Sequence, residues 1–153
     1  MPGYFLDTSA LAKLYHPEIG SERMESLAGA PNTRLIISQL SLIEIQSVFA
    51  TKVRTGVIGK TALDQLRGLF FSDLAKGHLE VVLLARRHFQ RAATLIRAHA
   101  VDYALRTLDA MQLSVALDLH RRGAASILVA SDKHLCDVAA IEGLTVLNPS
   151  KGP

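Results

Sequence analysis

The sequence has one cysteine, no tryptophan and only 5% aromatic residues among its 153 positions. A single cysteine, Cys136, excludes an internal disulfide and a thiolate metal site, so we expect it to be a small buried hydrophobic residue. The scarcity of aromatic residues argues against a base-stacking platform for single-stranded nucleic acid. With 49% hydrophobic and 20% charged residues, the sequence predicts one packed domain over residues 1–153.

Targeting and membrane segments are also missing from the pattern. The N-terminus has no basic region before Asp7, and the later apolar run 81–85 is too short to cross a bilayer. We therefore expect a cytoplasmic location.

The formal net charge is +3, and its distribution is uneven. The stretch 86–106 contains five arginines and two histidines against one acid, Asp102. Such a stretch attracts phosphate without sequence preference. Alternatively, it forms a solvated helix face whose arginine stems cover apolar neighbours.

Short apolar runs alternate with helical patterns along the chain. Strands are predicted at 3–6, 35–38, 79–84, 126–131 and 145–147. Helices are predicted at 10–15 with Ser9 as N-cap, 21–29, 39–54, 61–76, 88–100, 107–122 and 133–142. Strands that are apolar on both faces and alternate with helices predict an α/β fold, with a parallel sheet sandwiched between two helix layers.

Four acidic residues stand where burial disfavours a charge. Asp7 and Asp132 follow predicted strands, and open parallel sheets bind ligands beyond such strand ends. Glu44 and Asp109 have leucine or valine four residues before and after them on predicted helices, so each projects from an apolar face. An unpaired carboxylate costs several kcal/mol in such a place if it is fully buried.

Each acid has a purely structural explanation when it is taken alone. Asp7 and Asp132 suit turns or caps, Asp109 suits the first turn of a helix, and Glu44 could pair with an arginine. Their joint occurrence favours a shared site, because clustered carboxylates repel each other unless a cation neutralises them. Mg²⁺ and Mn²⁺ prefer such oxygen ligands. When bound at such a site, these ions activate a water molecule for attack on a phosphodiester.

Several segments, in order, resemble the PIN domain family and, within it, the VapC toxins of toxin–antitoxin pairs. YFLDTSAL at 4–11 resembles the opening strand with the first acid, and SLIE at 41–44 the helix with the second. LRTLDAMQL at 105–113 is the most specific segment. ASDKHL at 130–135 resembles the segment with the fourth acid, and GLTVLNP at 143–149 the usual ending.

This resemblance implies a five-stranded parallel sheet of order 3-2-1-4-5. It also implies an endoribonuclease that uses one or two Mg²⁺ or Mn²⁺ ions and metal-activated water to cleave RNA. A homodimer held inactive by a cognate VapB-like antitoxin is expected. By matching position, the catalytic and metal-binding acids would be Asp7, Asp109, Glu44 and Asp132, with supporting hydroxyls from Thr8 and Ser131.

Some residues suggest other interpretations. Asp137, the only candidate for a further acid, falls within a predicted helix and is interpreted as a surface residue. Haloacid dehalogenase chemistry requires a second acid two residues after the first. Ser9 occupies that position here, which disfavours this chemistry. Two alternatives stay open: a PIN nuclease of RNA processing without an antitoxin, and an inactive PIN module that binds RNA or protein. The mostly apolar helices over 39–76 offer a surface for a dimer or an antitoxin.

Overall fold

The structure of the protein, a computed structural model, describes residues 1–152. Helices and strands alternate in the predicted order. They are β1 (Gly3–Leu6), α1 (Thr8–Leu11), the 3₁₀ turn η1 (Ala12–Leu14), α2 (Ser21–Gly29), β2 (Arg34–Ser38), α3 (Gln39–Arg54), α4 (Lys60–Ala75), β3 (Glu80–Val82), α5 (Arg86–Tyr103), α6 (Thr107–Arg121), β4 (Ile127–Val129), α7 (Lys133–Ile141) and β5 (Thr145–Leu147).

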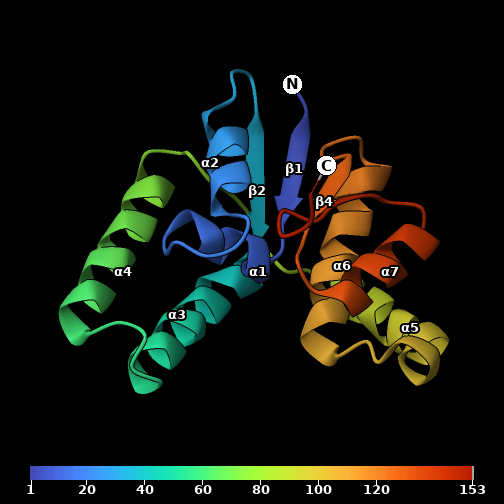
Figure 1. Cartoon of the computed structure of the whole chain (residues 1–153). Helices are drawn as coiled ribbons and strands as arrows, with labels where there is room; N and C mark the ends of the chain where they lie inside the picture. The colour runs from blue at the N-terminus through green and yellow to red at the C-terminus, as the bar shows by residue number, and fades with distance from the viewer. Residues whose placement is uncertain (153) are drawn as a thin grey trace.

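The five strands form one parallel sheet with the order β3-β2-β1-β4-β5, which confirms the predicted order. Strand β1 lies at the centre, and its last residue, Leu6, pairs with Val129 of β4. Figure 1 shows β1 and β2 side by side, with their arrowheads directed toward α1 and α3. The carboxyl ends of all five strands therefore meet at one edge of the sheet.

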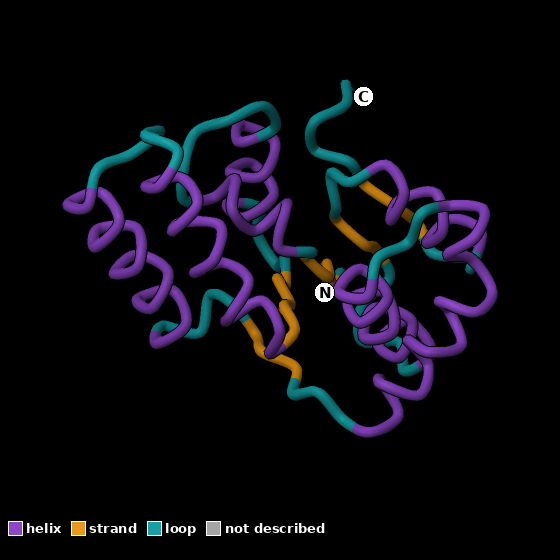
Figure 2. The backbone as a smooth tube through the Cα atoms, turned by 90° about the horizontal axis from the view of Figure 1, so that it is seen from below, coloured by secondary structure: helices purple, strands orange, loops and turns teal. Residues whose placement is uncertain are grey.

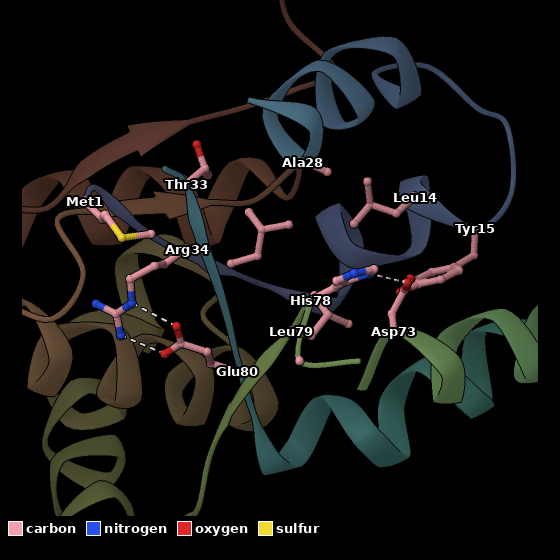
Figure 3. Close-up of a pocket in the computed structure, with 12 residues that line it drawn as sticks. Met1, Leu14, Tyr15, Ala28, Thr33, Arg34, Asp73, His78, Leu79 and Glu80 are labelled. Carbon is pink, nitrogen blue, oxygen red and sulfur yellow. Dashed lines mark hydrogen bonds and ion pairs between the residues drawn. The ribbon is translucent and has the colours of Figure 1, made fainter. Parts of the chain in front are cut away.

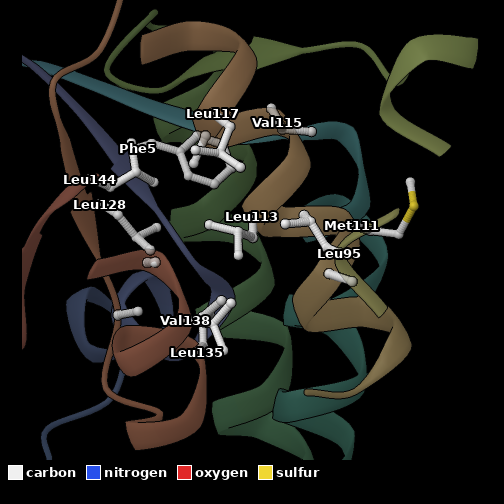
Figure 4. Packing of buried hydrophobic residues seen from close by; sticks show 14 of the residues in the cluster. Phe5, Leu95, Met111, Leu113, Val115, Leu117, Leu128, Leu135, Val138 and Leu144 are labelled. Atoms are coloured by element: carbon white, nitrogen blue, oxygen red, sulfur yellow. The ribbon is translucent and has the colours of Figure 1, made fainter. Parts of the chain in front are cut away.

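Helices cover both faces of this sheet, as the view in Figure 2 shows. Alternate strand residues divide between the two faces. Phe5 and Leu128 belong to the core shared with α5, α6 and α7, whereas Leu6 and Val129 belong to the core shared with α1 to α4. Figure 4 shows the first of these cores, in which Leu113 of α6 packs among the strand residues. The predicted three-layer sandwich is confirmed.

Gly3 of β1 lies directly against the loop that precedes β4. A Cβ at Gly3 would lie 2.2 Å from the carbonyl oxygen of Ala124. The backbone N–H of Ser126 donates to the Gly3 carbonyl at 3.1 Å, which holds the two segments together. Only glycine leaves room for this contact.

Several predicted boundaries are wrong. Asp7, not Ser9, is the N-cap of α1, because the Asp7 side chain accepts a hydrogen bond from the Ser9 N–H. Helix α5 is longer than predicted and ends only where Ala104 adopts a left-handed conformation with φ 51°. Strand β3 is shorter, because only residues 80–82 pair with β2. Within residues 1–152, no helix is both long enough and apolar enough to span a membrane.

Candidate active site

Asp7 lies directly after β1 and is held by its neighbour Ser9. Its Oδ2 atom accepts from the Ser9 hydroxyl at 2.7 Å and from the Ser9 N–H at 3.3 Å. The Ser9 hydroxyl also accepts from the backbone N–H of Ser131 at 3.1 Å, which ties the end of β1 to the segment after β4. Asp7 is only 7% exposed. The sheet order therefore fixes a buried carboxylate at the carboxyl edge.

Glu44 on α3 is oriented by two donors from other elements. The Thr8 hydroxyl donates to its Oε1 atom at 2.9 Å, and the Gln112 amide donates to the same oxygen at 2.8 Å. Gln112 is buried on α6, and its amide also donates to Ser41, while its carbonyl oxygen accepts from Ser38 at 2.8 Å. The buried Gln112 side chain thus joins α6 to the start of α3 and sets the position of the Glu44 carboxylate.

Sequence reasoning did not single out Gln112 as a functional residue. Its signal was a lone amide on the mostly apolar helix α6, three residues after Asp109. Neighbouring i and i+3 positions share a helix face, so Gln112 faces the same side of α6 as that acid.

Asp109 and Asp132 lie on either side of an arginine, Arg106. Asp109 falls in the first turn of α6 and is 9% exposed. The Arg106 Nε–H donates to its Oδ2 atom at 3.1 Å. Asp132 is the N-cap of α7, where its Oδ1 atom accepts from the Leu135 N–H at 2.9 Å. Its Oδ2 atom lies 3.8 Å from Nη2 of Arg106.

All four acids line one cavity of about 480 Å³. Glu44 and Asp109 come from α3 and α6, and Asp7 and Asp132 come from the connections after β1 and β4. Arg106 also lines the cavity. Burial is the main cause that raises the pKa of Asp7 to about 6. The hydrogen bonds from Ser9 oppose this rise, and the charges of Glu44 and Asp109 add to it. The cavity therefore holds a buried carboxylate that forms no ion pair in the part of the chain described.

The residues present fit a hard divalent cation in their chemistry. Every acidic ligand offers oxygen, and a cation would stabilise the charge of Asp7, whose pKa is raised chiefly by burial. As the described side chains stand, no group of three or more His, Cys, Asp or Glu residues is gathered around one point. Two of the four acids are instead turned toward the Arg106 guanidinium. The four acids supply oxygen donors along the lining of the cavity, and Arg106 pairs with two of them.

The remaining predicted residues lie at the margin of the cavity or outside it. Ser131 contributes its backbone N–H to Ser9, while its hydroxyl pairs with the Ser150 hydroxyl at 3.1 Å. Asp137 forms an ion pair with Lys133 on the surface of α7. Cys136 is half-buried, and burial is the main cause that raises its thiol pKa to about 11.

The basic stretch 86–106 divides between structural and exposed roles. His88 is buried, and Asp118 of α6 accepts hydrogen bonds from both Arg87 and His88 at 3.0 Å. Burial raises the pKa of Asp118, but these donors outweigh it and lower the pKa to about 2. His88 is therefore part of the packed interior and not of an exposed basic face. Asp118, which sequence reasoning missed, is a neutralised acid within the fold.

A second cavity of about 480 Å³ lies near the amino ends of β2 and β3, away from the four acids (Figure 3). Asp73 accepts from the Tyr15 hydroxyl at 2.7 Å and pairs with His78. Arg34 and Glu80 form a bidentate ion pair. Because these groups satisfy one another, the acid-lined cavity is the stronger candidate for chemistry.

The fold and the site define an α/β protein with a carboxylate cluster at the carboxyl edge of a parallel sheet. The PIN domain matches residues 4–141, so the chain belongs to the PIN domain family. No curated protein sequence matches it significantly.

Several solved structures share the fold at low identity. VapC20 of Mycobacterium tuberculosis, described as a Sarcin-Ricin loop cleaving toxin, has a TM-score of 0.65 and 18% identity, over 98% of this chain and 99% of that one. VapBC2 of Rickettsia felis, bound to a DNA fragment from its promoter, has a TM-score of 0.61 and 20% identity, over 95% and 98%. A toxin–antitoxin complex from Klebsiella pneumoniae has a TM-score of 0.58 and 20% identity, over 95% and 97%.

Proposed function

We propose that this chain is a divalent-metal-dependent endoribonuclease that acts as the toxin of a type II toxin–antitoxin pair. The observation that carries the proposal is the single cavity lined by Asp7, Glu44, Asp109 and Asp132. Membership of the PIN domain family supports a nuclease. The described fold neighbours, a cleaving toxin and two toxin–antitoxin complexes among them, support the toxin role.

The four acids would hold Mg²⁺ or Mn²⁺, one or two ions in all. A bound ion of this kind supplies a Lewis acid for the phosphodiester and lowers the pKa of water. The chain's own part is to fix the carboxylates in advance. Ser9 holds Asp7, and Gln112 holds Glu44. Fixed ligands lower the reorganisation needed when the phosphodiester binds.

Purified protein should cleave single-stranded RNA when Mg²⁺ or Mn²⁺ is added and not when a chelator is present. Asp7→Asn and Asp109→Asn should each lower the rate by at least about 100-fold, because each removes a charged ligand from the site. Asp137→Asn is the matched control, since it removes a surface acid of α7 outside the cavity and should cleave like the wild type. Equal cleavage by wild type, Asp7→Asn and Asp109→Asn would refute the assignment.

The exposed apolar surface of α3 and α4 supports the proposal of an antitoxin and a homodimer. Ile43 is 69% exposed and Leu69 is 57% exposed, and Ile43 also lines the acid cavity. A partner that covers Ile43 would also cover the mouth of the site. We expect a small protein encoded beside this chain to co-purify with it and to suppress RNA cleavage. Cleavage that no such neighbour suppresses would favour the RNA-processing alternative.

A further inference from the structure

Arg106 is the basic residue that lines the acid cavity among the residues described. It immediately precedes α6 as its N-cap, but its side chain makes no capping hydrogen bond. The side chain turns toward Asp109 and Asp132 and is nevertheless 76% exposed. The Arg106 side chain therefore does not cap helix α6, and its position is explained by its contacts in the acid cavity.

The contacts place the guanidinium between two of the four acids. Nε donates to Asp109 at 3.1 Å, and Nη2 lies 3.8 Å from Asp132. In the described part of the chain no hydrogen bond involves Nη1 of Arg106. A guanidinium carries five donors in a fixed fork that matches phosphate oxygens. Arg106 can therefore hold a carboxylate with one edge while the other edge faces solvent at the cavity mouth.

We propose that Arg106 has two roles at this site: it is the counter-ion that a divalent cation must displace, and it binds a phosphate of the RNA backbone. The inference rests on the proposed function for the identity of the nucleic acid. The first role follows from the two carboxylates that Arg106 approaches, which belong to the candidate ligand set. The second follows from its exposed donors at the entrance.

Displacement should be easy because exposed ion pairs are weak. The pairing competes with the ion without blocking it, so Arg106→Met should bind Mn²⁺ about threefold to tenfold more tightly than the wild type. Arg97→Met is the matched control. It removes the same charge from an exposed arginine of α5 whose side chain contacts Thr94 outside the cavity, and should leave Mn²⁺ affinity within twofold.

The Mn²⁺ arm is measured by isothermal titration calorimetry on the full chain, after thermal melting has confirmed that each variant is folded. Tighter Mn²⁺ binding by Arg106→Met, and not by Arg97→Met, supports the counter-ion role. Equal or weaker binding by Arg106→Met would overturn it.

The RNA arm is measured in chelator, where metal-dependent cleavage cannot occur, as the fluorescence anisotropy of a labelled single-stranded RNA. Arg106→Met should weaken RNA binding severalfold and reduce the slope of log K against log salt by about 0.7, the value for one phosphate contact. Arg106→Lys keeps the charge and should retain that slope. Equal RNA affinity of wild type and Arg106→Met, including no binding by either, would overturn the phosphate role.

Neither arm needs catalysis, so its failure is distinct from failure of the proposed function. A protein that binds Mn²⁺ and RNA as predicted, but leaves RNA intact in Mn²⁺, would refute the nuclease and retain both roles of Arg106.

Discussion

Asp7 should destabilise the metal-free protein at neutral pH, and Asp7→Asn should relieve that cost. Burial and the neighbouring acids raise its pKa from 3.8 to about 6 in the folded state. Asparagine has the same shape, carries no charge and is as good an N-cap as aspartate, so it can still accept the hydrogen bonds from Ser9. The substitution therefore removes the buried charge and keeps the local structure.

The sign and size follow from the two pKa values. Between pH 3.8 and about 6 the folded protein keeps a proton that the unfolded chain has released. The stability linked to Asp7 is therefore complete below pH 3.8 and is lost as the pH rises through about 6. At about 1.4 kcal/mol for each pKa unit, the loss amounts to about 3 kcal/mol.

Urea unfolding of wild type and Asp7→Asn in chelator, at pH values from 4 to 8, measures this loss. Asp7→Asn should be more stable by about 3 kcal/mol at pH 7.5, and the difference should vanish near pH 4. Asp64→Asn, an exposed acid on α4, is the control for the general effect of removing one negative charge. Equal stability of wild type and Asp7→Asn at pH 7.5 would refute the reasoning. Mn²⁺ should then stabilise the wild type and leave Asp7→Asn nearly unchanged.

Four further substitutions test the structure at the site and elsewhere in the fold. Gln112→Leu leaves the buried Ser38 hydroxyl without its acceptor and Glu44 without one of its donors, and denaturant unfolding should show a loss of about 3 kcal/mol. Asp118→Asn should cost about 2 kcal/mol at neutral pH. Because the folded pKa of about 2 lies below 3.8, that difference should disappear as the pH falls toward 2. Gly3→Ala forces its Cβ against the Ala124 carbonyl and should cost more than about 2 kcal/mol in a thermal melt. Gly68→Ala, in open space on α4, should instead stabilise by about 1 kcal/mol.

The fold was predictable because its strands are apolar on both faces and its helices have clear ends. Residues 39–54 and 145–147 were placed without error, since Gly56 and Pro149 punctuate the chain after them. The errors lie at helix and strand boundaries that are determined by tertiary contacts. The sequence pattern could not show that Asp7, and not Ser9, is the N-cap of α1, because this depends on the extended backbone at the end of β1. Nor could it show that Ala104 would adopt a left-handed conformation, which is uncommon for alanine.

The candidate site was predictable only in part, because two kinds of residue carry different signals. Acids on apolar helix faces are visible in a sequence, and Glu44 and Asp109 were found in that way. Residues that orient these acids or neutralise their charge are of common types, so they give no distinct signal in the sequence. Gln112 acts through partners more than 60 positions away, such as Ser41, and only the packing of α6 against α3 reveals this. Arg106 stood in a basic stretch whose other members point elsewhere, so its place in the cavity needed the structure.

Asp118 and Asp7 show why a buried acid alone does not identify a catalytic site. Both side chains are at most 7% exposed. Asp118 accepts from His88 and is surrounded by arginines, so its pKa falls to about 2 and its charge stabilises the fold. Asp7 is hydrogen-bonded by Ser9 alone within residues 1–152, and further acids face it, so its pKa rises to about 6. The uncompensated charge of Asp7 does not stabilise the fold unless a cation neutralises it, because an asparagine at position 7 would cap α1 equally well. Under the proposed function, the carboxylate at position 7 serves the divalent cation, because an asparagine there would meet the needs of the fold.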